Sequence, residues 1–301
     1  MRLVVVGGTG FIGRHVTRSL LDAGHDVTVL GRHPDAASRI PELAGANAAR
    51  GDVTDAASLT GTLEGAGGVV MAVTFPNYPM EQRRKGLTFE RYEAGGARNL
   101  LAEATRAGVE RFLYVSGAGA DSGSAKSWYR AKGLAEEAIK ASGIDYVIIR
   151  PSWIYGPGDK SVNKMVSMAK LSPVVPKLGV RPQRIQPLYV GDFAEAVTRA
   201  FERDAAWSNT FEIGGPEVMT MTEVIYAIAE VLGKKRVVLP IPLPLAKLGT
   251  APFLALPKPP MTPTGVEFVA QDGLVDMRLT TRLLEVKPVT FRDGLSRYLK
   301  P

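Results

Sequence analysis

The sequence predicts an α/β fold in which a parallel, doubly wound sheet is covered by helices on both faces. In the first half of the chain, short runs rich in Val, Ile and Leu alternate with stretches whose apolar residues recur at helical spacing. Continuous apolar strands that alternate with helices are typical of parallel sheets buried on both faces. Gly24, Gly108 and Gly143 each follow a predicted helix, at the position where a left-handed residue commonly ends one.

We expect at least six strands in this half of the chain. They fall at 3–6, 26–30, 47–50, 69–73, 112–115 and 146–149, with helices at 11–23, 56–63, 88–107 and 127–141. After residue 150 prolines become frequent and the alternation is lost, with further helices at 192–203 and 221–232. We expect Asp192 to cap the first of these helices, and Thr220 or Thr222 the second. The sequence therefore predicts a first domain over 1–150 and a smaller C-terminal substrate lobe over 151–301, interleaved with the sheet.

The most informative motif lies at the start of the chain, where an apolar strand runs into closely spaced glycines. Gly7, Gly10 and Gly13 follow residues 3–6 and open the helix at 11–23. Gly7 allows a sharp turn, Gly10 leaves room for a pyrophosphate near the backbone, and Gly13 lets the helix pack closely on the sheet. The N-terminal N–H groups of the helix then face the phosphates. An ordinary tight turn is the alternative, but the strand before the motif and the helix after it indicate a Rossmann-type dinucleotide site.

The residue after the second strand indicates which dinucleotide is bound. An acidic residue there selects NAD, whereas a basic residue accommodates the 2′-phosphate of NADP. Arg32 follows this strand, and no carboxylate occurs before Asp35. We therefore expect NADP(H) to be preferred, with NAD(H) as the alternative. Asp52, after the third strand, is expected either to accept a hydrogen bond from the adenine amino group or to cap a helix that begins near Asp55.

The composition of the 301 residues excludes several kinds of site. The absence of Cys removes disulfides, thiolate metal sites and cysteine nucleophiles. His15, His25 and His33 all lie near the N-terminus, so we expect no zinc site and no Ser-His-Asp triad, and we place all three at the surface or in loops. The net charge of +7 is scattered, which does not indicate nucleic-acid binding. Without a signal peptide or an apolar run of membrane-spanning length, we expect a cytoplasmic protein, with a membrane-peripheral location as the alternative.

Segment 240–257 is apolar, rich in proline and carries a single charge. Its prolines forbid a continuous membrane-spanning helix. We expect a helix whose apolar face packs on the core; the alternative is an exposed flap that contacts a membrane surface, a protein complex or a hydrophobic ligand. Four aromatic residues in loops at strand ends suggest an apolar pocket for a quinone, isoprenoid or steroid-like carbonyl compound. They are Phe75, Tyr78, Trp153 and Tyr155.

Several segments resemble signatures of the extended and atypical short-chain dehydrogenase/reductase superfamily. They are residues 7–13, 51–52, 96–101, 111–116 and 150–158. Segments 186–192 and 211–216 are most similar to the branch that contains the nucleotide-binding accessory subunit of respiratory complex I and its bacterial relatives. The resemblance covers nearly the whole chain and implies an NAD(P)-dependent oxidoreductase.

The resemblance also implies where chemistry would take place. In the superfamily a Tyr and a Lys four residues apart share a helix; the Lys holds the nicotinamide ribose and lowers the phenol's pKa from about 10, so that the Tyr can shuttle a proton. Lys132 matches the lysine, but Trp128 stands in place of the Tyr, and an indole N–H cannot shuttle a proton. Tyr129 lies one residue later, rotated by about 100° around the helix. The superfamily's Ser/Thr falls near Gly117, beside Ser116.

Two functions follow from this incomplete pattern. The protein is either a slow NADP(H)-dependent reductase of a hydrophobic carbonyl or quinone-like substrate, or a non-catalytic NADP(H)-binding structural or redox-sensing protein, like the complex I accessory subunit. In the first case we expect the catalytic residues to be Tyr129, Lys132 and Ser116. In both cases we expect the cofactor to contact Gly7, Thr9, Gly10, Phe11, Ile12, Gly13, Arg32, Asp52, Val53, Ala72, Val73, Lys132, Pro151 and Ser152.

Overall fold

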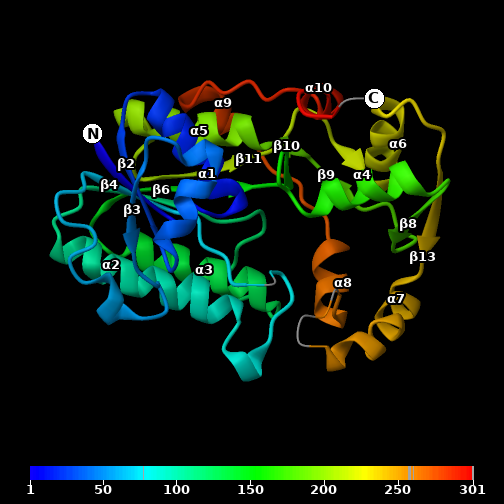
Figure 1. Ribbon diagram of the computed structural model, residues 1–301, viewed down its shortest axis with the longest axis horizontal. Coiled ribbons are helices and arrows are strands. Elements are labelled where there is room, and N and C mark those ends of the chain that lie inside the picture. Colours follow the sequence, from blue (N-terminus) through cyan, green and yellow to red (C-terminus); the bar gives the residue numbers. More distant parts are fainter. Residues whose placement is uncertain (77, 257–258, 260, 300–301) are drawn as a thin grey trace.

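A seven-stranded parallel sheet forms the centre of the protein, in the strand order β11-β6-β5-β4-β1-β2-β3. The computed structural model describes residues 1–76, 78–256, 259 and 261–299. The strands of the sheet are β1 (Arg2–Val6), β2 (Asp26–Gly31), β3 (Asn47–Arg50), β4 (Gly68–Met71), β5 (Arg111–Val115), β6 (Asp145–Pro151) and β11 (Asn209–Ile213). The predicted α/β class with a parallel, doubly wound sheet is confirmed (Figure 1).

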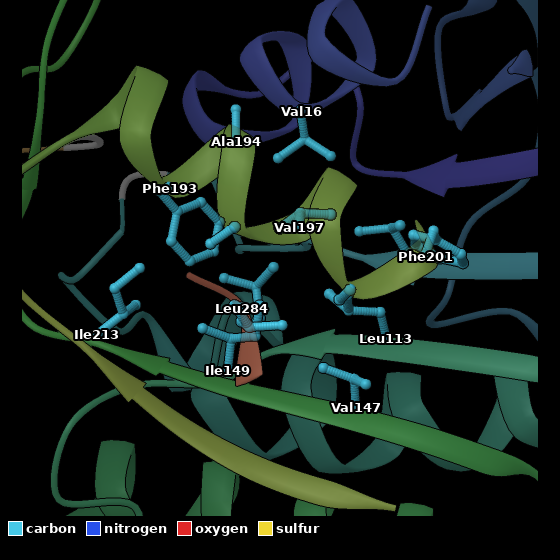
Figure 2. Packing of buried hydrophobic residues seen from close by; sticks show 14 of the residues in the cluster. Val16, Leu113, Val147, Ile149, Phe193, Ala194, Val197, Phe201, Ile213 and Leu284 are labelled. Atoms are coloured by element: carbon cyan, nitrogen blue, oxygen red, sulfur yellow. The ribbon is translucent and has the colours of Figure 1, made fainter. Parts of the chain in front are cut away.

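Helices cover both faces of this sheet (Figure 1). On one face α1 (Phe11–Asp22) packs beside α5 (Val190–Glu202), and on the other α2 (Gly96–Arg106) lies beside α3 (Ser127–Lys140). Figure 2 shows the core on the first face, where α1 and α5 meet the strands through Val16, Leu113, Val147, Ile149, Phe193, Ala194, Val197, Phe201, Ile213 and Leu284. Each fully buried large apolar side chain stabilises the fold by about 1.5–3 kcal/mol. This layer therefore fixes α5, from the C-terminal half, onto the N-terminal sheet.

The C-terminal half both completes the sheet and builds a second lobe. Asn209–Ile213 pairs in parallel with the end of β6, so the chain returns to the sheet after leaving it. The remaining elements are β7 (Ile154–Tyr155), α4 (Ser161–Leu171), β8 (Val174–Leu178), β9 (Arg184–Ile185), β10 (Leu188–Tyr189), β12 (Met219–Thr220), α6 (Met221–Val231), β13 (Val237–Ile241), α7 (Leu243–Gly249), α8 (Pro263–Val269), α9 (Arg278–Leu283) and α10 (Phe291–Ser296). A domain boundary at residue 150 stays a prediction.

Two of the predicted helices have a different form. The helix expected at 56–63 is a short 3-10 helix, η3 (Ala56–Leu59), because Gly61 and Gly65 adopt φ values of +80° and +68° that interrupt it. The helix expected at 88–107 begins as a π-helical turn, η5 (Glu90–Gly95), and continues as α2. A π turn carries an extra residue, which rotates the side chains relative to the rest of the helix.

The predicted caps are mostly confirmed. Gly24, Gly108 and Gly143 have φ values of +80°, +67° and +78° just past three helices. Thr220 caps α6 and forms a capping box with Glu223. The prediction that Asp192 caps the helix expected at 192–203, which is α5, was wrong.

Asp192 lies in the first turn of α5, which begins at Val190, two residues earlier than expected. Its carboxylate is buried and accepts a hydrogen bond of 2.8 Å from the backbone N–H of Val289. Asp192 thus ties α5 to the C-terminal segment instead of satisfying the start of its own helix.

The apolar segment does not pack as expected. It forms the end of β13, then α7 and a 3-10 helix, η7 (Ala251–Ala255); its last residue, Pro257, lies outside the described residues. α7 buries none of its residues, and Leu245 and Leu248 are 60% and 71% exposed. The expectation that its apolar face packs on the core was wrong, because the prolines cut the segment into short pieces, of which the first pairs with β8 and α7 lies against α8. Across the described part of the chain, no helix combines the length and apolarity needed to cross a bilayer.

Candidate functional site

The glycine turn after β1 forms a cradle that side chains would fill. Gly7 has a φ of +85°, and a Cβ placed on it would lie 2.5 Å from the carbonyl oxygen of Ala72. A Cβ on Gly13 would lie 2.3 Å from the carbonyl oxygen of Gly7, so only glycine lets α1 approach so closely. Gly10 is exposed and precedes α1 without a side-chain cap. The first N–H groups of a 12-residue helix are thus left open, which fits the pyrophosphate of a dinucleotide.

Further predicted contacts gather at the same edge of the sheet. Thr9, Phe11 and Ile12 are partly buried around the turn. Ala72 and Val73 follow β4, which pairs directly with β1, and the N–H of Ala72 bonds to the carbonyl of Val6. The carboxyl ends of adjacent parallel strands are where such sheets bind ligands.

The predicted cofactor contacts at the end of β6 are already bonded within the protein. Pro151 is buried, and its carbonyl accepts a hydrogen bond from the N–H of Ala118. The hydroxyl of Ser152 donates to the carbonyl of Gly273 across 2.5 Å, so it connects the sheet with the C-terminal lobe.

Arg32, Asp52 and Val53 lie at the far end of this edge. Arg32 follows β2, is exposed, and bonds to no other residue in the described part of the chain. Asp52 Oδ1 accepts hydrogen bonds of 2.9 Å from both the N–H and the hydroxyl of Thr54, while Asp55 caps η3. Val53 is buried, with its side chain against α2. Helix capping near this point is therefore done by Asp55 and not by Asp52.

Lys132 lies on α3 beneath the loop that follows β5. Its Nζ donates to Glu93 Oε2 across 3.2 Å and to the carbonyl of Val115 across 3.3 Å. A Cβ on Gly117 would lie 3.2 Å from Lys132 Cδ, so the lysine stem runs against the backbone of that loop. Only 12% of the Lys132 side chain is exposed. Sequence reasoning missed Glu93, since nothing in the local pattern distinguishes it from a solvated helix residue.

Trp128 and Tyr129 point in different directions from the start of α3. Trp128 is buried, and its indole N–H donates to Gln271 Oε1 across 3.0 Å. Tyr129 is half-buried against Gly119, where a Cβ would lie 2.7 Å from its ring. Burial raises the pKa of the Tyr129 phenol above its usual value of 10. This shift is opposite to the lowering that a proton-shuttling tyrosine requires.

Ser116 is engaged by a second buried carboxylate. Its hydroxyl donates to Glu136 Oε1 across 2.5 Å, and Arg150 binds both oxygens of Glu136 at 2.9 and 2.6 Å. Glu136 was not among the residues predicted from the sequence. Its position gave a signal, because it follows Ala135 on the face of α3 that packs on the sheet.

The four aromatic residues expected to line one pocket lie in two places. Phe75 and Tyr78 pack with Phe89, at centroid distances of 5.0 and 5.4 Å. Tyr155 is fully buried against Phe291, and the indole N–H of Trp153 bonds to Ser161. The expectation of a single pocket was wrong, because β7 carries the second pair into the core of the C-terminal lobe.

Phe268, on α8, completes the first of these clusters. Its ring lies 5.5 Å from both Tyr78 and Trp128. A cavity of about 410 Å³ opens beside the indole, between the start of α3 and α8. It is lined by Glu81, Arg83, Ala125, Lys126, Ser127, Trp128, Arg130, Thr264 and Glu267. Apart from the indole, this lining is mainly polar or charged.

The histidines also differ from expectation. His33 is exposed after β2, as predicted. His15, however, lies on α1, partly buried, with its Nε2 3.1 Å from the carbonyl oxygen of Pro157. Burial lowers the pKa of His15.

A family model described as NAD(P)H-binding matches residues 7–174, more than half of the chain. The chain belongs to this family. It is an extended short-chain dehydrogenase/reductase, as the resemblance implied, and the glycine cradle lies within the matched region.

Known relatives of this NAD(P)H-binding protein have different functions. It is 28% identical to the mitochondrial subunit 9 of the NADH dehydrogenase (ubiquinone) 1 alpha subcomplex of Arabidopsis thaliana, over 82% of this chain and 62% of that protein. It is 29% identical to a ceramide reductase of Caulobacter vibrioides, over 80% of this chain and 74% of that protein. The fold matches the NADPH-dependent quinone oxidoreductase of Escherichia coli complexed with NADPH, with a TM-score of 0.76, 21% identity, and coverage of 98% and 99% of the two chains.

Proposed function

We propose that this protein binds NADP(H) in preference to NAD(H) and slowly reduces a hydrophobic carbonyl or quinone-like compound. The observation that supports binding is that one nucleotide-binding domain holds both an open glycine cradle at α1 and the half-buried ammonium of Lys132. Slow turnover is proposed because the buried Trp128 stands where the resemblance calls for a proton donor. When bound, NADPH supplies the hydride. The rate then depends on how this chain delivers a proton to the carbonyl oxygen.

The chain offers a group for each part of the cofactor. The glycine turn would bind the pyrophosphate, and the free guanidinium of Arg32 would face the 2′-phosphate. Asp52 and the backbone after β4 would lie near the adenine. Lys132 would hold the nicotinamide ribose.

Proton delivery is the weak part of the site. Ser116 is bound to Glu136, and the raised pKa of Tyr129 keeps its phenol protonated but poorly matched to neutral pH. We infer that Tyr129 or a water molecule donates the proton, and that this step limits turnover. The names of the ceramide reductase and the quinone oxidoreductase indicate an apolar class of substrate, and the indole of Trp128 offers such a substrate an apolar surface in the cavity beside α3.

The second candidate function is a non-catalytic one, in which bound NADP(H) serves as structure or as a redox signal. The bond from Trp128 to Gln271 favours it, because the indole closes the space that a catalytic phenol would occupy. The similarity to a complex I subunit points the same way.

We also infer that segment 240–256 contacts an anionic lipid surface, which would make the protein membrane-peripheral. Residues 234–256 contain four basic residues and no acidic one. Leu245, Leu248 and Leu254 are each at least half exposed. α7 lies at the end of the molecule remote from the nucleotide-binding sheet (Figure 1), so it can meet a membrane while the cofactor site stays open.

Fluorescence titration with NADPH, followed by assays of NADPH oxidation with a quinone and a hydrophobic ketone, tests the first proposal. We expect binding together with slow turnover. Binding without turnover across both substrate classes supports the non-catalytic function instead, and failure to bind NADPH overturns both.

A further inference from the structure

Glu93 is a buried carboxylate that the π-helical turn directs into the protein. Only 1% of Glu93 is exposed, whereas Glu90, three residues earlier in the same turn, is exposed. π turns are rare, and they frequently occur at functional sites because they redirect one side chain. The turn places Glu93 beside α3 and β5, at the Nζ of Lys132.

Both hydrogen bonds of the Glu93 carboxylate are made to the same oxygen. Tyr114 donates its hydroxyl to Oε2 across 2.6 Å, and Lys132 donates to the same oxygen across 3.2 Å. The other oxygen, Oε1, is buried and has no hydrogen-bond partner among the described residues. An unsatisfied buried carboxylate oxygen is costly, so its retention requires an explanation.

Glu136 provides a contrast within the same helix layer. Both of its oxygens are satisfied, by Arg150 and by Ser116, as expected for a structural ion pair. Glu93 holds an ammonium that has three donors, of which one goes to Glu93 and one to the carbonyl of Val115. One N–H of Lys132 is therefore left for a ligand.

We propose that Glu93 is a positioning residue that fixes the ammonium of Lys132 beneath the nicotinamide ribose. The proposal rests on the proposed function, in which Lys132 holds that ribose. The carboxylate supplies the counter-charge beside the half-buried ammonium, and the π turn sets the depth at which the ammonium lies. Without Glu93, the contacts that the described residues offer the ammonium are uncharged: the carbonyl of Val115 and the ring of Tyr114, whose centroid lies 5.3 Å from Nζ.

The other titratable groups around this pair are few. Tyr114 comes from β5, and burial next to Glu93 raises its pKa well above 10, so it remains a neutral donor. Tyr78, in the loop after β4, is held protonated in the same way. Glu136, on α3, is neutralised by Arg150.

The experiment is a double-mutant cycle on NADPH affinity, with Glu93→Gln, Lys132→Met and the double variant. We expect Glu93→Gln to raise the Kd of NADPH about tenfold, and to change it less than about twofold in the Lys132→Met background. Glu93→Asp, which keeps the carboxylate, should recover part of the affinity that Glu93→Gln loses. Equal effects of Glu93→Gln in both backgrounds overturn the proposal.

Two further variants keep the test decisive. Glu103→Gln replaces another buried carboxylate, on α2 and paired with Arg106, and should leave NADPH affinity unchanged. If Glu93→Gln does not fold, Glu93→Asp keeps the charge and shortens the reach; it should weaken NADPH binding in the natural background and have no further effect in the Lys132→Met background. If Lys132→Met alone leaves affinity unchanged, the assigned role of Lys132 fails and Glu93 has nothing to position. If Lys132→Met weakens binding but Glu93→Gln does not, only the role of Glu93 fails.

Discussion

The indole N–H of Trp128 donates to Gln271 Oε1 across 3.0 Å, and this bond ties the start of α3 to the C-terminal lobe. Phe268, three residues before Gln271, lies 5.5 Å from the same indole. Trp128 therefore serves as a packing and bridging residue, at the position where the resemblance leads us to expect the superfamily's proton-donating tyrosine. Whether the protein is an enzyme depends on what replaces that donor.

Trp128→Tyr restores a phenol at this position and should increase carbonyl reduction. General acid–base catalysis contributes about 10²–10⁴-fold, so we expect at least a tenfold gain in NADPH oxidation with a hydrophobic ketone. Trp128→Phe is the matched control, because it frees the same space as Trp128→Tyr but introduces no phenol hydroxyl that could donate a proton. A natural protein that turns over briskly, and loses this activity in Tyr129→Phe, would instead identify Tyr129 as the acid.

Arg32 should determine the choice of cofactor. It is exposed after β2, with no partner among the described residues to hold it elsewhere. We expect NADPH to bind at least tenfold more tightly than NADH, a difference of about 1.4 kcal/mol. Arg32→Asp should abolish or reverse this preference, whereas Arg39→Asp, an equal charge change at an exposed position of the next turn, should not. Equal affinities for both cofactors in the natural protein would contradict the prediction.

The sheet and the glycine turn could be predicted because their signals are local. The apolar run before Gly7 is a strand in its own right, and the φ of Gly7 and the tight approach of Gly13 are demanded by neighbours only a few residues away. Helix ends at Gly24, Gly108 and Gly143 are equally local.

The interior of the site could not be predicted in the same way. Glu93 reads as a solvated helix residue, and only the π turn and the packing of α3 bury it beside Lys132. Gln271 lies 143 residues from Trp128 in sequence. The exposure of α7 was equally hidden, because an apolar segment predicts burial whether or not the fold provides a partner.

His15 should make the protein less stable in mild acid. Burial lowers its pKa in the folded state below the unfolded value of 6.5. The unfolded chain therefore takes up a proton first, and stability present above pH 6.5 is lost as the pH falls toward the folded pKa. In urea unfolding, the free energy of unfolding of the natural protein should fall between pH 7.5 and 5. The fall should be smaller for His15→Asn, and the two falls should differ by less than about 1 kcal/mol. His33→Asn, at an exposed site, should decline like the natural protein; an unchanged decline in His15→Asn would assign the effect to other groups, such as His25.

Contact with lipid should depend on the exposed leucines of α7. Leu245 and Leu248 are 60% and 71% exposed, and insertion of each into the boundary of a bilayer would remove most of that apolar surface from water. We expect the protein to sediment with vesicles that contain anionic lipid, and the Leu245→Ser/Leu248→Ser variant to bind them at least about tenfold more weakly.

The control for this prediction is Val218→Ser, which removes an apolar side chain that is 56% exposed before β12, outside the segment. It should bind vesicles like the natural protein. The basic residues at 234–236 predict that neutral vesicles bind more weakly than anionic ones and that added salt reduces the difference. Equal binding of the natural protein and the leucine variant to anionic vesicles would exclude α7 as the contact. If no vesicle binds, the exposed leucines do not serve a lipid surface, and a protein partner becomes the occupant to test.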